Sequence, residues 1–137
     1  MLHKKLIASA LTALALVAPV AAQTWPQQPV KMVVPFAPGG ATYLIARLLA
    51  DHFTRRLGQS FVVENRGGAS GIVGTQAVQT ARADGYTLLV SGNGPHATNV
   101  ALFRKLPYDP LKDFAQISIV GQLPLVLNVN PGPPRAR

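Results

Sequence analysis

The stretch VKMVVPFAPGGATYLIARLLADHFTRRLG, residues 30–58, decides the fold class. Its first seven residues are mostly β-branched or apolar, which predicts a short strand over 30–36, and the breaker cluster 37–40 follows. From 41 to 57, core-type residues recur at three- and four-residue steps, which is typical of an amphipathic helix ended by Gly58. The positions predicted to face the core are Ile45, Leu48, Leu49, His52, Phe53 and Leu57.

The strand-then-helix pattern occurs again downstream. Residues 61–65 predict a second strand, and the glycine-rich stretch 67–74 opens a second helix that ends near Ala81. Residues 86–91 form a continuous apolar run, as in a buried parallel strand, and a polar loop is expected over 92–99. This order predicts an α/β fold with a mainly parallel sheet and helices on both faces.

Beyond this loop the pattern weakens. It predicts a short helix over 100–106, a turn at 107–110 and an extended, bent segment over 116–129. The ending PGPPRAR, residues 131–137, predicts no regular element. A sheet of three or four strands that stops in such a tail is expected to be incomplete.

The N-terminus predicts export. Lys4 and Lys5 precede the apolar run 6–17, and small residues lie before a cut expected after Ala22, so residues 1–22 are typical of a secretory signal peptide. The alternative is a membrane anchor, but the apolar run is shorter than the roughly 20 residues a spanning helix needs, and Pro19 interrupts it. We therefore expect a periplasmic protein.

Composition limits the remaining classes. Removal of residues 1–22 leaves 137 − 22 = 115 residues, enough for one modest domain, with 11 Lys and Arg against 5 acids. The basic residues are scattered and no nucleic-acid module is recognisable, so no nucleic-acid partner is expected. There is no cysteine, and only His52 and His96 remain after signal cleavage, so neither disulfides nor a metal site is predicted.

Two glycine-rich loops point to anion binding. Each follows a predicted strand and opens a helix, and in an open parallel sheet such loops lie at the ligand-binding edge. Unpaired backbone N–H groups and the helix dipole favour an anion there, and glycine permits close approach. The alternative, that these glycines only make tight turns, stays open for either loop alone. Nearby polar candidates are Thr42, Ser70, Ser91, Asn93, His96, Thr98 and Asn99.

Enzyme motifs are incomplete. The stretch ASGIVG, residues 69–74, resembles a dinucleotide fingerprint with its first glycine replaced, but no acid follows about 20 residues later. Ile72 stands where a nucleophile elbow needs glycine, and no Gly-Lys-Ser/Thr follows either loop. Neither an enzyme nor a cofactor is predicted. A small exported enzyme acting on a phosphorylated substrate is the less favoured alternative, because only His96 could act as its base.

Several motifs in a fixed order resemble one known family. They are Trp25-Pro26, Pro38-Gly39-Gly40, Ala46-Arg47, residues 62–66 (VVENR), Gly68-Ala69-x-Gly71-x-x-Gly74, residues 84–89 (DGYTLL), residues 106–110 (LPYDP) and residues 112–114 (KDF). Over about residues 25–130 the chain resembles the tripartite tricarboxylate transporter receptors, also called the Bug family. The resemblance implies a bilobed periplasmic-binding-protein-like (type II) fold that closes on a small organic acid and delivers it to membrane permease subunits.

The resemblance also implies where the ligand binds. In that family the glycine loops of the first lobe hold a carboxylate, largely through main-chain groups and water. The corresponding ligand-binding residues of this chain are Pro38, Gly39, Gly40, Ala41, Thr42, Gly68, Ala69, Ser70, Gly71, Gly74, Gly94, His96 and Asn99. Tyr43 departs from the family by replacing an aspartate, and Pro95 replaces a hydroxyl residue.

The expected organisation is a signal peptide (1–22), a partial N-terminal α/β lobe (23–122), and the start of a crossover with an aberrant Pro/Arg tail (123–137). The second lobe is expected to be absent, because the family chain is about twice as long. The resemblance therefore predicts a truncated copy of a solute receptor, expected to be a monomer. A non-functional remnant is the alternative.

Overall fold

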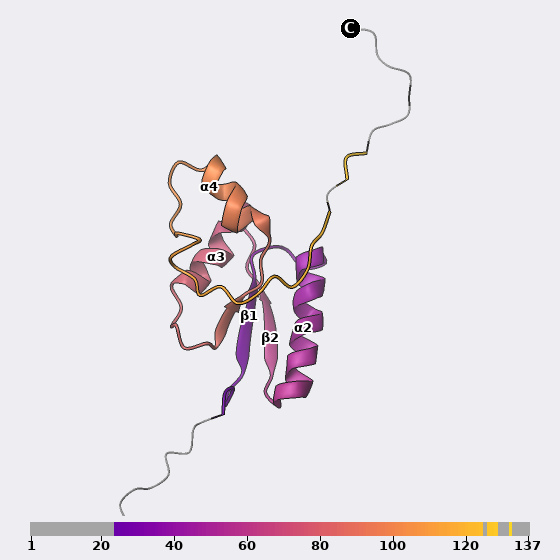
Figure 1. The fold of residues 1–137 in the computed structure, drawn as a ribbon, viewed down its shortest axis with the longest axis vertical. Helices are drawn as coiled ribbons and strands as arrows, with labels where there is room; N and C mark the ends of the chain where they lie inside the picture. The colour runs from indigo at the N-terminus through magenta and orange to yellow at the C-terminus, as the bar shows by residue number, and fades with distance from the viewer. Residues whose placement is uncertain (1–23, 125, 129–131, 133–137) are drawn as a thin grey trace, which may run out of the picture.

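A computed structural model describes residues 24–124, 126–128 and 132 of the chain. Its core is a three-stranded parallel sheet in the order β2-β1-β3, made of β1 (Val30–Val34), β2 (Phe61–Asn65) and β3 (Thr87–Leu89) (Figure 1). The predicted α/β fold with a parallel sheet is confirmed. The expected signal peptide and most of the Pro/Arg tail lie outside the described residues.

The central strand β1 is buried on both faces. Val30, Met32 and Val34 point to one side and join a core cluster that includes alanines of helix α2 (Ala41–Leu57). Val33 points to the opposite side by strand alternation and is buried as well. Helix α3 (Ile72–Gln79) packs on β1 and β3. A strand covered on both faces requires the near-continuous apolar run that this segment has.

Helix α2 has the predicted bounds but a different buried stripe. Gly58 ends it in the left-handed conformation, with φ of 72°, and donates its N–H to the Thr54 carbonyl. Ala46 and Ala50 are its buried residues, whereas Leu48 is 71% exposed. The helix approaches the sheet through small side chains, which a pattern of large apolar residues does not reveal. The prediction that Leu48, His52 and Leu57 face the core is wrong, because all three side chains are exposed.

The second helical region is broken into two parts. A 3₁₀ turn, η1 (Ala69–Gly71), leads into α3, which ends at Gln79 rather than near Ala81. Within α3, a Cβ on Gly74 would lie 2.5 Å from the Arg66 carbonyl oxygen and 2.8 Å from Pro35 Cα. Glycine at this position therefore lets α3 pack directly against the end of β1.

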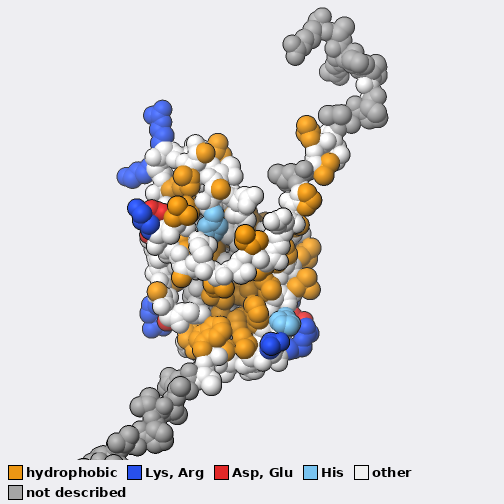
Figure 2. All heavy atoms as spheres, viewed as in Figure 1, with side chains coloured by type: hydrophobic (Ala, Val, Ile, Leu, Met, Phe, Trp, Pro, Cys, Tyr) orange, Lys and Arg blue, Asp and Glu red, His pale blue; other side chains and the backbone are white. Residues whose placement is uncertain are grey.

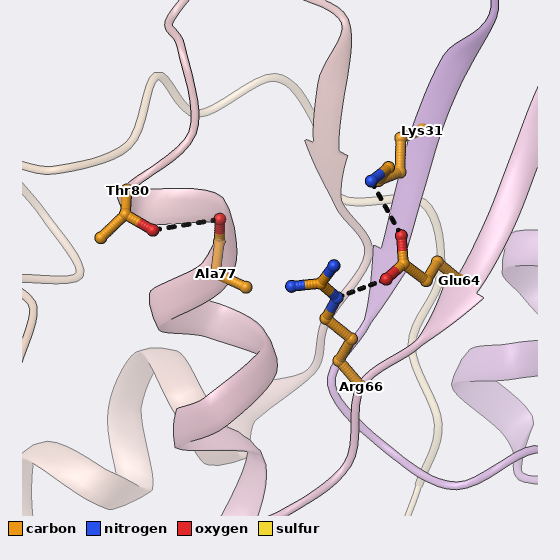
Figure 3. A network of polar contacts seen from close by, with 5 residues as sticks. All are labelled: Lys31, Glu64, Arg66, Ala77 and Thr80. Atoms are coloured by element: carbon orange, nitrogen blue, oxygen red, sulfur yellow. Dashed lines mark hydrogen bonds and ion pairs between the residues drawn. The ribbon is translucent and has the colours of Figure 1, made fainter.

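One polar cluster spans the two neighbouring strands (Figure 3). Glu64 of β2 accepts from Lys31 Nζ of β1 at 3.0 Å and from Arg66 Nε just beyond β2. These hydrogen bonds, first from Arg66 and then from Lys31, lower the pKa of the Glu64 carboxyl below its usual range. All three side chains are partly exposed, so the pairs contribute at most about 1 kcal/mol to stability.

The region after β3 differs most from expectation. The predicted polar loop over 92–99 contains a π-helical turn, η2 (Gly94–Thr98), and the helix expected over 100–106 is the shorter α4 (Asn99–Leu102). The third strand is also shorter than predicted. A tertiary contact explains the ordered turn, because the Tyr108 hydroxyl donates to the Pro95 carbonyl at 2.8 Å.

The extended segment predicted over 116–129 forms no strand in its described residues. Its large apolar side chains are exposed, Ile117 at 80% and Leu127 at 91%. An extended chain without a pairing partner gains no ladder hydrogen bonds, so the apolar pattern alone does not make a strand. No helix in the described part of the chain is long and apolar enough to cross a membrane.

Candidate functional site

Three loops leave the sheet at the same edge. The strands are parallel and in register, with Val34 opposite Asn65 and Val33 opposite Leu89, so their carboxyl ends lie side by side. The segments that follow are 35–40 after β1, 66–71 after β2 and 90–99 after β3, the last of which contains η2 and ends at the first residue of α4. In open parallel sheets this edge is where ligands bind. The two glycine loops that the sequence singled out are therefore neighbours.

Two amide side chains hold these loops together. Asn65 donates from Nδ2 to the Phe36 carbonyl at 2.9 Å, which joins the second loop to the first. Asn99 donates from Nδ2 to the Ser70 carbonyl at 3.0 Å, which joins the third loop to the second. Asn99 is only 2% exposed, so its side chain acts in the structure as a brace between loops. Such a role for Asn65 could not be predicted from the sequence, since its partner lies 29 residues away.

The N-terminus of α2 has the strongest anion-binding character. Gly40 occupies the N-cap position in an extended conformation, no side chain caps the helix, and its first turn has no acidic residue. The first backbone bond back to Gly40 comes from the Leu44 N–H, at 3.1 Å. The amides of Ala41, Thr42 and Tyr43 precede it and have no partner within the helix. Residues 38–41, where the helix begins, are exposed, so these amides can donate to an anion.

The second loop is more constrained than the sequence predicts. The Gly71 amide already donates to the Gly68 carbonyl at 2.9 Å, and the Ile72 amide donates to the Ala69 carbonyl. These two donors are therefore engaged by the protein itself. Gly74 is buried in the contact between α3 and β1, which is a packing position rather than an accessible one. Residues 66–70 of this loop are exposed, and they include Gly68, Ala69 and Ser70.

Backbone strain is concentrated in this second loop. Ala69 and Ser70 have φ of 45° and 55°, a left-handed conformation that costs energy for residues with a Cβ. Gly71 has φ of 85°, and a Cβ there would lie 2.8 Å from Pro95 Cγ of the third loop. The bond from Asn99 to the Ser70 carbonyl helps to hold this conformation. Strain of this kind is common at ligand-binding sites.

The third loop is compact and partly buried. Pro95 is fully buried against Gly71. His96 is half-buried, and its ring packs edge-on against Phe114 with 5.8 Å between the ring centroids. Burial lowers the pKa of His96, so its imidazole is neutral at physiological pH. Its Nδ1 and the Ser91 hydroxyl are buried and have no hydrogen-bond partner among the described residues. Gly94, at the start of η2, is half-buried.

The two departures from the resembled family have packing roles here. Tyr43 is half-buried and packs against the core cluster under α2. Pro95 fills the space beside Gly71, and its carbonyl accepts from Tyr108. Both residues therefore stabilise the elements that carry the loops.

The edge is an open surface with no metal centre. Within residues 24–124, 126–128 and 132, no group of three or more His, Asp or Glu side chains is placed to hold a metal ion. Two hollows lie elsewhere on the molecule: one beside α4 and another lined by Arg47, Ala50, Asp51, Thr54 and Phe61. Neither includes a residue of the two glycine loops. What the glycine edge offers is backbone N–H groups, a helix dipole and a few small polar side chains.

A parallel α/β sheet with an uncapped helix and glycine turns at one edge defines a lobe of the solute-binding type. Residues 45–136 match the family described as tripartite tricarboxylate transporter family receptor. The chain belongs to this family, which consists of receptors rather than enzymes.

Individual relatives agree with this assignment. Protein BugT of Bordetella pertussis is 49% identical over 115 residues, which are 83% of this chain and 35% of that protein. Among solved structures, MatC from Rhodopseudomonas palustris with bound malate is similar with a TM-score of 0.63 and 46% identity, over 66% of this chain and 31% of MatC. An R. palustris protein solved with adipate gives a TM-score of 0.62 and 45% identity, over 64% of this chain and 29% of that one. The chain spans about a third of the length of these relatives.

Proposed function

We propose that this chain forms the carboxylate-binding lobe of a periplasmic receptor for a small organic acid. The observation that carries the proposal is the α2 N-terminus, whose first-turn amides have no partner within the helix and no side-chain cap, and which follows β1 at the sheet edge where the second glycine loop follows β2. A carboxylate placed there accepts from the amides of Ala41 and Thr42 and gains from the positive end of a 17-residue helix. The similarity to proteins solved with malate and with adipate supports a carboxylate as the ligand.

The geometry narrows the set of residues that contact the ligand. We propose Pro38 to Thr42 and, from the exposed second loop, Gly68 to Ser70 as the contact residues. Asn99, Gly74 and Gly71 support the site by bracing and packing. His96 and Gly94 lie in the partly buried part of the third loop. The His96 imidazole is neutral there, so it adds no charge that would favour one anion over another.

Delivery of the ligand to membrane permease subunits is the second part of the proposal, and the family name supports it. It requires export, so we propose cleavage of a signal peptide after Ala22. Mass spectrometry of a periplasmic extract checks this directly. The expected product has the mass of residues 23–137, and recovery of the uncleaved chain in the cytoplasm would be inconsistent with a periplasmic receptor.

Binding is tested by titrating the ¹⁵N-labelled chain with adipate or malate and following its amide resonances. We expect affinity in the millimolar range, because the described edge is an open surface that leaves much of the ligand hydrated. The largest shifts should occur at Ala41, Thr42 and residues 68–70. Adipamide, which has the same length but no charge, is the control ligand. Equal shifts with adipamide, or adipate shifts confined to other surfaces, would argue against the proposal.

A further inference from the structure

The second glycine loop contains a left-handed run that its glycines explain only in part. Residues 68–71 all have positive φ, from 45° at Ala69 to 133° at Gly68. Gly68 and Gly71 adopt such values at little cost because they have no Cβ, whereas Ala69 and Ser70 adopt them against their intrinsic preference. Contacts from outside the turn must therefore hold its two central residues in this conformation.

The left-handed conformation leaves two consecutive amides open. The Gly71 and Ile72 amides are used within the turn, but no hydrogen bond joins the N–H of Ala69 or Ser70 to another described residue. Both residues are exposed. Successive N–H groups in a turn form a concavity that favours an anion. The directions of these two N–H groups depend on the backbone dihedral angles of the turn, so a right-handed turn would point them elsewhere.

One buried side chain reaches this turn from the third loop. Asn99 Nδ2 donates to the Ser70 carbonyl at 3.0 Å, and Asn99 is only 2% exposed. The direction of that carbonyl is set by the ψ angle of Ser70, which is 34° in the left-handed conformation. A Ser70 in another conformation would turn its carbonyl away from Asn99 and lose the bond. The Asn99 amide therefore favours the left-handed form.

Asn99 is itself held in place by its own loop. Its backbone N–H donates to the Gly94 carbonyl, and its carbonyl accepts from the Phe103 N–H at 3.0 Å. The same loop is fixed through Pro95, whose carbonyl accepts from the buried Tyr108 hydroxyl at 2.8 Å. A donor on such a support does not follow the second loop if that loop moves. It can therefore select one conformation of the turn that it contacts.

This contact lies at the proposed ligand edge. Helix α4, which begins with Asn99, lies beyond the carboxyl ends of the strands, at the end of the molecule where α2 begins (Figure 1). In the same view, Figure 2 shows backbone and uncharged polar atoms over much of that half of the molecule, whereas apolar side chains gather in the other half. Main-chain groups therefore reach the surface where the loops meet.

We propose that Asn99 is a positioning residue for carboxylate binding. Its side-chain amide holds Ala69 and Ser70 in the left-handed conformation and so keeps their two N–H groups open to the ligand, without contacting the ligand itself. Only the part that concerns the ligand rests on the proposed function. When the Asn99 donor is removed, the turn populates other conformations, and the apparent affinity falls with the fraction of molecules that remain competent.

A double-mutant cycle, followed by the NMR titration with adipate, separates positioning from direct contact. Asn99→Leu keeps a similar side-chain size but removes the donor, and Ser70→Gly removes the cost of the left-handed conformation. Asn99→Leu should weaken adipate binding about fivefold, which corresponds to the net contribution of one hydrogen bond. In the Ser70→Gly background the same change should weaken binding less than about twofold, because a glycine turn needs no brace.

The conformation of the turn is measured without ligand. Three-bond HN–Hα couplings and ¹³C chemical shifts of residues 69 and 70 report their φ angles, and in Asn99→Leu they should move toward right-handed values. Asn93→Leu is the matched control, because Asn93 is exposed in the same loop and its side chain caps nothing. Circular dichroism checks folding. If Asn99→Leu does not fold, Asn99→Ala takes its place in the cycle.

The outcomes separate the role of Asn99 from the receptor proposal. Unchanged couplings in Asn99→Leu, or an equal change in Asn93→Leu, would overturn the positioning role. Equal losses of affinity in the wild-type and Ser70→Gly backgrounds would also overturn it, because Asn99 would then act on the ligand directly. Altered couplings with no adipate response even in the wild type would support the hold of Asn99 on the turn and contradict the receptor function. Altered couplings with unchanged adipate affinity would overturn the role in binding and leave the receptor proposal intact.

Discussion

The substitution Gly40→Asp tests whether the α2 N-terminus is an unoccupied anion site. Gly40 has φ of −76° and ψ of 167°, the usual N-cap conformation, and a Cβ there meets nothing within 4 Å. An aspartate fits without strain and can accept from the free amides of the first turn. The introduced carboxylate should therefore stabilise the protein and interfere with ligand binding.

The size of the stability gain follows from three contributions. A carboxylate at the helix N-terminus interacts with the dipole by about 0.3–1 kcal/mol. Side-chain capping adds a few tenths over glycine, and the loss of glycine's freedom in the unfolded state adds about 0.4–1 kcal/mol. The sum is about 1–2 kcal/mol, which corresponds to a rise in Tm of roughly 4 °C per kcal/mol for a domain of this size.

Binding should change in the opposite direction. The introduced carboxylate occupies the amides that we assign to the ligand and repels its charge, so adipate-induced amide shifts should require at least tenfold more ligand. Gly40→Asn is the matched control, because asparagine caps about as well as aspartate without a charge. It should stabilise the chain but weaken adipate binding less.

Thermal unfolding and the NMR titration measure the two effects. Unchanged adipate binding in Gly40→Asp, together with a raised Tm, would show that the ligand does not bind at this helix terminus. The absence of any stabilisation would show that the first-turn amides are already satisfied, which contradicts the structural basis of the site.

Three further predictions concern the elements that support the site. Gly74→Ala should destabilise the chain by roughly 1–3 kcal/mol, because its Cβ would lie 2.5 Å from the Arg66 carbonyl oxygen. Denaturant unfolding measures the loss of stability. Gly92→Ala is the control, because a Cβ at Gly92 meets no atom within 4 Å. Burial lowers the pKa of His96, so the unfolded chain binds more protons and stability should fall as pH drops below about 6.5. His96→Gln should reduce that slope in urea midpoints between neutral and mildly acidic pH, and an identical slope in both proteins would contradict it. The pKa of Glu64 is lowered, first by Arg66, so its stabilising contribution is present above its ordinary pKa and is lost as pH falls through the folded value. Glu64→Gln should therefore cost at most about 1 kcal/mol at neutral pH and nothing at acidic pH.

Much of the fold could be predicted because its signals are local. The bounds of α2 and β2 match the sequence-based prediction, since Gly58 ends the helix and β-branched residues form the strand. The order of strands and helices also predicted a parallel sheet. The signals failed where long-range contacts decide the structure. The turn η2 depends on Tyr108, and the helix stripe depends on how closely Ala46 approaches the sheet.

The candidate site, like the fold, could be predicted from the sequence only in part. Glycine loops after two strands were sufficient to predict that both lie at one edge, because the carboxyl ends of parallel strands always coincide. Sequence could not show which amides remain available. The second loop uses its Gly71 and Ile72 donors internally, whereas the α2 N-terminus has no side-chain cap.

The sequence by itself determined the order of strands and helices, the positions of the glycine turns and the family to which the chain belongs, because these depend on residues close together along the chain. Only the tertiary structure decided which polar groups are free. Asn65 and Asn99 each reach a carbonyl 29 residues away, and Gly74 is fixed by Pro35 and Arg66. Hydrogen-bond donors are satisfied by whatever the fold brings within about 3 Å, and that distance cannot be read from spacing along the chain.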